Sequence, residues 1–266
     1  MKRVLTALVL VPVAVYSVLF SPPQFLVAAV AMFSVLCYRE YARITDAWAA
    51  PGYAAGLLIL IAPLSQAALI VFLTALAALS LTLSSEDLTK GAARAAALVM
   101  GVAYIFGSWK TAIQLATDVN SPGLWHLTAG RHWLMFALMV NWIGDTGAYY
   151  VGRKFGRHKL APRISPGKSW EGSVASACTS LIFGVVYVPL AITGTPVWIA
   201  ALIALVANAA GQLGDLAESA LKRGAGVKDS GTMLPGHGGM LDRLDSSLFS
   251  IPVVYALVMF MSGFKA

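Results

Sequence analysis

The sequence is 266 residues long, 58% hydrophobic and only 12% charged, with a mean hydropathy of +0.75. Soluble domains carry about 25% charged residues, so the composition excludes an ordinary soluble enzyme and predicts an all-α, polytopic integral membrane protein. The net charge of +7 does not predict a nucleic-acid partner, because the basic residues gather in loops between apolar segments.

Nine apolar segments are candidates for transmembrane helices, which need about 20 residues each. In chain order they cover residues 4–20, 24–38, 53–64, 66–83, 95–116, 132–151, 172–192, 196–221 and 247–262. The third segment is short, and we expect it to be tilted or to cross only part of the membrane. The pattern therefore predicts about nine transmembrane helices.

The basic residues indicate the orientation of these helices. If the N-terminus is cytoplasmic, all but three of the 19 Lys and Arg residues fall in cytoplasmic segments, the exceptions being Lys110, Arg131 and Lys265. An excess of Lys and Arg in cytoplasmic loops is typical of multi-pass membrane proteins. The sequence thus predicts a cytoplasmic N-terminus and a C-terminus on the outer side.

The two halves of the chain differ in polarity. Residues 1–130 contain few polar groups within the apolar segments, and we interpret them as scaffold helices; the alternative is that they shape a groove for lipid tails. Arg39, Glu40 and Arg43 end the second segment and are expected at the level of the lipid headgroups. Residues 131–266 are predicted to be the catalytic region, with cytoplasmic loops 152–171 and 222–246.

The sixth segment contains the first candidate site residue. Asn141 and Asp145 are four residues apart and share a helix face. An ionised Asp at the centre of a membrane costs about 2.5–3.5 kcal/mol on insertion scales, so it requires a partner, hydration or a function. We interpret Asp145 as a substrate-binding residue; the alternative is a structural pair with a cation of a neighbouring helix.

The loop that follows, 152–171, holds six basic residues and one acid, interrupted by Gly and Pro. Ser165 and Lys168 offer a hydroxyl and an ammonium group just before the next helix, where anions bind well. We therefore predict a phosphate-binding loop. The alternative is an ordinary basic loop attracted to anionic headgroups.

Polar residues recur at spacings of four and three along the eighth segment. They fall within about 40° of one direction on a helix, which predicts a polar face turned toward protein or water. The members are Asn208, Gln212, Asp215, Ser219 and Lys222. Hydrogen bonding between helices explains Asn208 well. It explains Asp215 poorly, because Asp215 stands near the cytoplasmic end, and we interpret Asp215 as a metal ligand.

The stretch from 215 to 245 concentrates the charges of an otherwise apolar protein. Carboxylates bind hard divalent metals, Lys and Arg bind phosphates, and glycines let backbone N–H groups approach an anion. This combination predicts metal-assisted phosphoryl or nucleotidyl transfer. The candidate catalytic residues are Asp215, Lys222, Arg223, Lys228, Asp229, His237, Asp242, Arg243 and Asp245; the candidate substrate-binding residues are Asp145, Ser165, Lys168, Ser219, Gly238 and Gly239.

We expect Mg²⁺ as the cofactor, because oxygen ligands predominate and one His cannot form a usual zinc site. Asp242 and Asp245 are three residues apart and can face one point, and Asp242 beside Asp215 would form an oxygen-rich site. A second cation could be held by Asp145 or Asp245.

The stretch from Ser219 to Asp245 also resembles the signature of the phosphatidate cytidylyltransferases, or CDP-diacylglycerol synthases, without a departure at its fixed positions. The resemblance implies that CTP and phosphatidate react to form CDP-diacylglycerol and pyrophosphate in phospholipid biosynthesis. It also implies a bacterial inner-membrane enzyme whose site faces the cytoplasm. The oligomeric state is left open, with a homodimer as one option.

Two other functions fit some of these features. A membrane transporter of an anionic substrate would explain polar helix faces, but the charges gather at one membrane side rather than at the midplane. A CDP-alcohol phosphatidyltransferase would require a D-x2-D-G-x2-A-R motif, which the sequence lacks.

Overall fold

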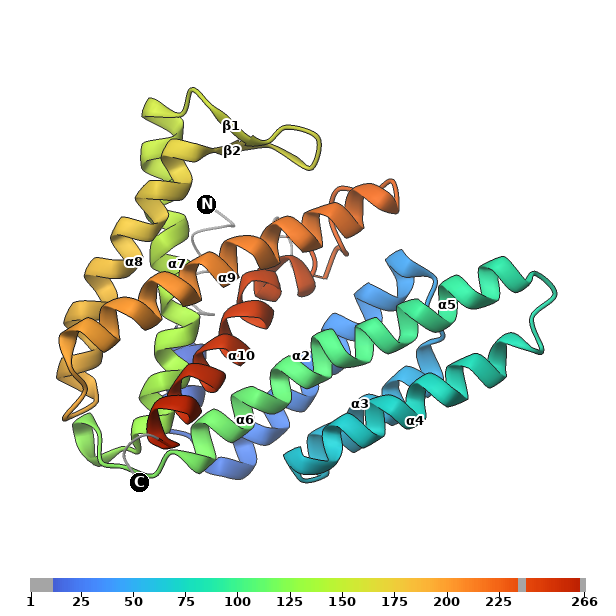
Figure 1. Cartoon of the computed structure of the whole chain (residues 1–266), viewed down its shortest axis with the longest axis horizontal. Coiled ribbons are helices and arrows are strands. Elements are labelled where there is room, and N and C mark those ends of the chain that lie inside the picture. Colours follow the sequence, from blue (N-terminus) through green and yellow to red (C-terminus); the bar gives the residue numbers. More distant parts are fainter. Residues whose placement is uncertain (1–11, 234–237, 264–266) are drawn as a thin grey trace.

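The computed structural model describes residues 12–233 and 238–263. Within these residues, long helices are joined by short connections and one two-stranded sheet (Figure 1). The elements are α2 (Pro23–Thr45), α3 (Ala49–Ile61), α4 (Leu64–Thr82), α5 (Leu88–Gly101), the π-helix η1 (Val102–Gly107), α6 (Ser108–Asp118), the 3-10 helix η2 (Leu124–His126), α7 (Ala129–Phe155), β1 (Lys159–Ala161), β2 (Ser165–Ser169), α8 (Trp170–Ala191), α9 (Val197–Gly224) and α10 (Leu241–Gly263).

Six of the described helices are long and apolar enough to cross a membrane. They are α2, α4, the continuous rod formed by α5, η1 and α6, and then α8, α9 and α10. The 27-residue α7 and the 13-residue α3 are further helices at predicted segments. Residues 4–11 of the first predicted segment lie outside the described residues, and 12–19 are helical. The protein is therefore an all-α, multi-pass membrane protein. The number of nine spans and the side of the membrane on which each terminus lies stay predictions.

The short predicted segment is a short helix. Thirteen residues rise about 20 Å, less than the roughly 30 Å of the hydrocarbon core. Lys110 from α6 donates through Nζ to the carbonyl oxygen of Leu60 at 3.1 Å, in the last turn of α3. Because the last carbonyls of a helix lack partners within the helix, this buried ammonium stabilises the end of α3. Lys110, one of the three basic residues outside the predicted cytoplasmic segments, thus has a structural partner.

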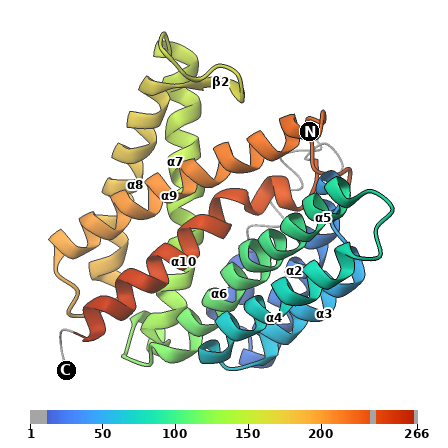
Figure 2. The same cartoon turned by 45° about the vertical axis from the view of Figure 1, so that its right-hand side comes forward.

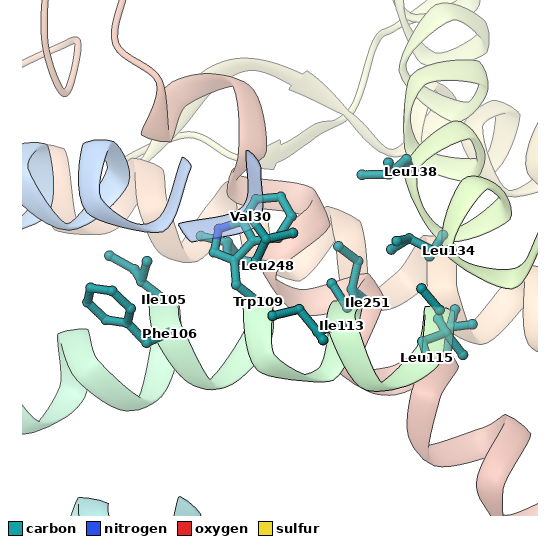
Figure 3. Packing of buried hydrophobic residues seen from close by; sticks show 14 of the residues in the cluster. Val30, Ile105, Phe106, Trp109, Ile113, Leu115, Leu134, Leu138, Leu248 and Ile251 are labelled. Atoms are coloured by element: carbon teal, nitrogen blue, oxygen red, sulfur yellow. The ribbon is translucent and has the colours of Figure 1, made fainter. Parts of the chain in front are cut away.

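Two antiparallel helix pairs form one side of the molecule. Figures 1 and 2 show α7 and α8 side by side with the β-hairpin at their shared end, and α9 beside α10. Helix α10 contacts α2, α6, α7 and α9, so it connects the two halves of the chain. Figure 3 shows this junction, where apolar side chains from several helices meet: Val30, Trp109, Ile113, Leu134, Leu248 and Ile251.

Helix α4 shows how the outer surface is adapted to lipid. Its buried residues are Ile70, Thr74 and Ala78, whereas large apolar side chains such as Phe72 and Leu79 are exposed. Such a surface would favour aggregation in water, but it is well solvated by lipid tails.

The loop 152–171 contains the antiparallel hairpin β1–β2, which the sequence did not predict. Lys159 pairs with Ser169, and Ala161 pairs with Ser165. The hydroxyl of Ser169 then caps α8 by accepting the N–H of Gly172 at 3.2 Å. Strands of three and five residues give no readable alternation, so the sequence signal was limited to Gly and Pro.

Candidate active site

A charged cavity of about 370 Å³ lies where α7, α9 and α10 converge. Seven of the predicted site residues line it, together with Asn141, Trp142, Ser246 and Ser247. The seven are Asp145, Asp215, Lys222, Asp229, Asp242, Arg243 and Asp245. Residues that are up to 100 positions apart in the sequence therefore line one cavity.

Asp215 forms an ion pair with the phosphate-binding candidate of the hairpin. Its Oδ2 lies 2.5 Å from Nζ of Lys168, and both side chains are about a quarter exposed. On its other side, Oδ1 accepts the hydroxyl of Ser219 at 3.3 Å, one turn further along α9. Figures 1 and 2 show the hairpin extending from the shared end of α7 and α8. Lys168 belongs to β2, so its ion pair with Asp215 joins the hairpin to α9.

Lys222 is held between two carboxylates. Its Nζ lies 2.6 Å from Oε2 of Glu218 and 2.7 Å from Oδ1 of Asp242, and the Glu218 side chain is fully buried. A buried ammonium needs such partners, because an unpaired charge in a low-dielectric interior is costly. The arrangement fixes the end of α9 to the first turn of α10.

Asp242 also organises the connection between α9 and α10. Its carboxylate accepts the backbone N–H of Ser230, at 3.0 Å to Oδ2, and the N–H of Gly239, at 2.7 Å to Oδ2. Gly238 has φ +82°, and a Cβ at this position would lie 2.6 Å from Oδ2 of Asp242. Only glycine suits both the backbone angle and the close approach. Both oxygens of Asp242 are thus engaged by protein donors.

A carboxylate from the N-terminal half completes this connection. Glu40, which we expected among the lipid headgroups, is only 4% exposed. Its Oε2 accepts the hydroxyl of Ser230 at 2.9 Å and the N–H of Leu241 at 2.8 Å. The sequence did not predict Glu40, Glu218 or Ser230 as members of the site. The available signal was an acid inside an apolar helix, which requires a partner.

The remaining predicted residues lie around this centre. Arg223 donates to the carbonyl oxygens of Ile164 at 3.3 Å and Val227 at 3.0 Å, and so links α9 to the hairpin. Lys228 is exposed on the connection, and Ser165 begins β2. Gly239 packs against Glu40. His237 lies outside the described residues.

A second cavity of about 350 Å³ adjoins the first and shares Asp145 with it. It lies between α7, α8, α9 and the hairpin, and Arg153, Lys168, Ser173 and Gln212 are among its lining residues. Two adjacent cavities, with basic side chains in each, offer room for two anionic groups.

The inner part of the polar face of α9 binds another helix. Asn208 donates through Nδ2 to the hydroxyls of Ser176 and Ser180, each at 2.9 Å, and accepts Nε2 of Gln212 at 2.6 Å. Gln212 also accepts the hydroxyl of Ser173. These bonds join α9 to α8, as the structural alternative for Asn208 predicted.

The donor set suits a hard cation, although the described residues form no preformed coordination sphere. Asp145, Asp215 and Asp245 line the same cavity and offer only oxygen atoms. Among residues 12–233 and 238–263, no three His, Cys, Asp or Glu side chains are close enough together to hold a metal ion. The Mg²⁺ site stays a prediction. Among the candidate ligands, Asp242 accepts from three residues, Lys222, Ser230 and Gly239, whereas Asp215 contacts one ammonium group and one hydroxyl.

The fold and the site define a multi-pass membrane protein with a cavity of carboxylates and basic side chains. The sequence profile of the Cytidylyltransferase family matches residues 1–261, and the chain belongs to this family. The chain is 47% identical over 129 residues to the phosphatidate cytidylyltransferase of Staphylococcus saprophyticus, covering 48% of this chain and 50% of the relative. It is 46% identical over 132 residues to that of Staphylococcus haemolyticus, covering 50% and 51%. The chain thus spans about half the length of the curated relatives it matches.

Proposed function

We propose that the protein is a phosphatidate cytidylyltransferase, which converts CTP and phosphatidate to CDP-diacylglycerol and pyrophosphate. The observation that carries this proposal is the charged cavity, because residues of the family signature build it. The names of the relatives supply the substrates. The homodimer that the sequence left open stays an expectation.

The reaction needs charge neutralisation more than a strong base. A phosphate oxygen of phosphatidate attacks the α-phosphorus of CTP, the bond from that phosphorus to the bridging oxygen breaks, and pyrophosphate leaves. The phosphate monoester is already an anion near neutral pH. The protein therefore has to offset negative charge and align the two substrates.

Basic side chains at the two cavities are suited to this task. Lys222 and Arg243 line the first cavity, Arg153 lines the second, and Lys168 lies at the boundary through its ion pair with Asp215. We assign Lys168 and Arg243 to the phosphates of the substrates and Lys222 to the buried framework, since two carboxylates already hold it.

The residues that would hold Mg²⁺ are Asp145, Asp215 and Asp245, and the same carboxylates could hold a second cation. When bound, the cation supplies positive charge to phosphate oxygens. Asp242 we assign to positioning, because Lys222, Ser230 and Gly239 engage its carboxylate.

The proposed topology has nine spans, a cytoplasmic N-terminus and site, and an external C-terminus in a bacterial inner membrane. Cysteine labelling tests it in a Cys178→Ser background, because Cys178 is exposed whereas Cys37 is buried. Arg157→Cys should react only from the cytoplasmic side and Asn120→Cys only from outside; both native side chains are exposed. The reverse result would overturn the orientation.

The assay for the function uses purified protein in phosphatidate vesicles with Mg²⁺. CTP labelled at the α-phosphate should yield labelled lipid, and CTP labelled at the γ-phosphate should yield labelled pyrophosphate and unlabelled lipid. Diacylglycerol in place of phosphatidate is the control, since it lacks the attacking phosphate. Absence of labelled lipid with phosphatidate would refute the proposal.

A further inference from the structure

The contact between Glu40 and the α9–α10 connection joins distant parts of the chain. We use the term connection for the described residues 225–233 and 238–240 between the two helices. Glu40 lies on α2, in the half of the chain interpreted as scaffold, and its carboxylate is 190 positions from Ser230 in sequence. The Glu40 residue is only 4% exposed. A carboxylate at such a position needs hydrogen bonds from the protein to replace those it would make with water.

The carboxylate of Glu40 joins an inner residue of the connection to the start of α10. Its Oε2 accepts from Ser230, which follows Asp229 of the cavity wall, and from the N–H of Leu241, the first residue of α10. Hydrogen bonds to an ionised acceptor are short and about twice as strong as neutral ones. Glu40 therefore fixes the spacing between the point where the connection leaves the cavity and the start of α10.

Two glycines show how closely the connection follows this carboxylate. A Cβ on Gly239 would lie 2.4 Å from Oε2 of Glu40 and 2.2 Å from Oγ of Ser230. A Cβ on Gly231 would lie 2.5 Å from Oε1, and its three nearest atoms all belong to Glu40. A side chain at either glycine would therefore force the Glu40 carboxylate to move from its present position.

We propose that Glu40 is a positioning residue of the active site, which holds the α9–α10 connection so that Asp242 and Lys222 keep their places at the cavity. Ser230 and Gly239 donate to Asp242 as well as packing on Glu40, so the two carboxylates share one framework. The N-terminal helices thereby contribute to turnover. The proposal rests on the proposed function for its kinetic readout.

The test compares four variants in purified full-length protein: Glu40→Ala, Glu40→Gln, Gly231→Ala and the double variant Glu40→Ala/Gly231→Ala. Glu86→Ala is the matched control, because Glu86 is an exposed acid of the same half that lines a separate cavity. For each we would measure kcat and KM for CTP, the thermal midpoint, and amide hydrogen exchange of the connection without substrate.

Glu40→Ala should lower kcat about ten- to hundredfold, because small displacements of site groups have effects of this size. Exchange in 228–233 and 238–241 should accelerate, whereas amides of α7 and α8 keep their protection. Glu40→Gln keeps one acceptor oxygen, so kcat and the protection of the connection should both be partly retained. Gly231→Ala should resemble Glu40→Ala, and the double variant should be no worse than Glu40→Ala, since both changes break the same contact.

The inference would be overturned if Glu40→Ala kept the wild-type kcat and the wild-type exchange rates in the connection. Losses of kcat in the double variant equal to the sum of the two single losses would also overturn it. Exchange that accelerates uniformly over the protein would reduce Glu40 to a general stabiliser and also overturn it. If the wild type itself forms no labelled lipid, the proposed function fails. Hydrogen exchange then still decides whether Glu40 orders the connection.

Discussion

The polar face of α9 has two segments that differ in their partners. Asn208 and Gln212 bond to hydroxyls and amides on α8 and on α9 itself. Asp215, further toward the end of the helix, pairs with Lys168 of the hairpin instead. One helical spacing places all of them on one face, so spacing predicts the face. The chemistry of each side chain and its partner decides whether the residue joins helices or forms the site.

The energies of the two segments explain the difference. Neutral hydrogen bonds between membrane helices contribute about 0.6 kcal/mol on average, which suffices to align helices without making any one bond indispensable. Charged groups cost several times more in the hydrocarbon region unless they are paired or hydrated. Asp215 is about a quarter exposed at a polar cavity, where water and substrates are accessible.

Removal of divalent cations should have the largest effect and should separate the two segments. The oxygen donors of Asp145, Asp215 and Asp245 predict that EDTA abolishes turnover and that Mg²⁺ or Mn²⁺ restores it. The thermal midpoint should change little, because the Asn208 network holds α8 and α9 without metal. Full turnover in excess chelator would show that the carboxylates serve another purpose.

The Asp242→Asn substitution should affect stability and activity together. It removes the charge that Lys222 and two backbone N–H groups share, although Glu218 still pairs with Lys222. Loss of a charged hydrogen-bond partner costs about 1.5–3 kcal/mol, so the thermal midpoint should fall and turnover with it. A stable Asp242→Asn protein that is inactive would instead restore Asp242 as a metal ligand.

Substitution of Asn208 should give the smallest effect. Asn208→Ala removes two hydrogen bonds to α8 and should destabilise the protein by about 0.6–1.7 kcal/mol, in the range measured for membrane helices. Turnover at saturating substrate should stay close to that of the wild type. A loss of activity as large as that expected at Asp215 would remove the distinction between the segments.

Much of the architecture was predictable because it follows from the chain locally. Apolar stretches predicted the long helices, and the spacing of polar residues predicted which side of α9 meets protein. The charges of 215–245 had no favourable location in lipid, and six of these residues line one cavity. The family signature predicted the family, which the match over residues 1–261 confirms.

Features that depend on distant partners were not predictable. Glu40 looked like a headgroup residue because its partners, Ser230 and Leu241, are about 200 positions away. Asp242 pairs with Lys222, only 20 positions away, whereas the sequence favoured a site in which Asp242 and Asp215 share a metal ion. The π-helix η1 also left no sign, because it changes the backbone winding inside one continuous apolar helix.

The most direct test of the account compares the wild type with Asp215→Asn in phosphatidate vesicles supplied with α-labelled CTP and Mg²⁺. The substitution keeps the shape of the side chain and removes its charge, and Lys168 is exposed enough to tolerate the loss of its partner. The wild type should form labelled CDP-diacylglycerol, and the variant should keep its thermal midpoint but turn over at least about 100-fold more slowly. A wild type that forms no labelled lipid, or a folded Asp215→Asn protein that turns over at the wild-type rate, would contradict these expectations.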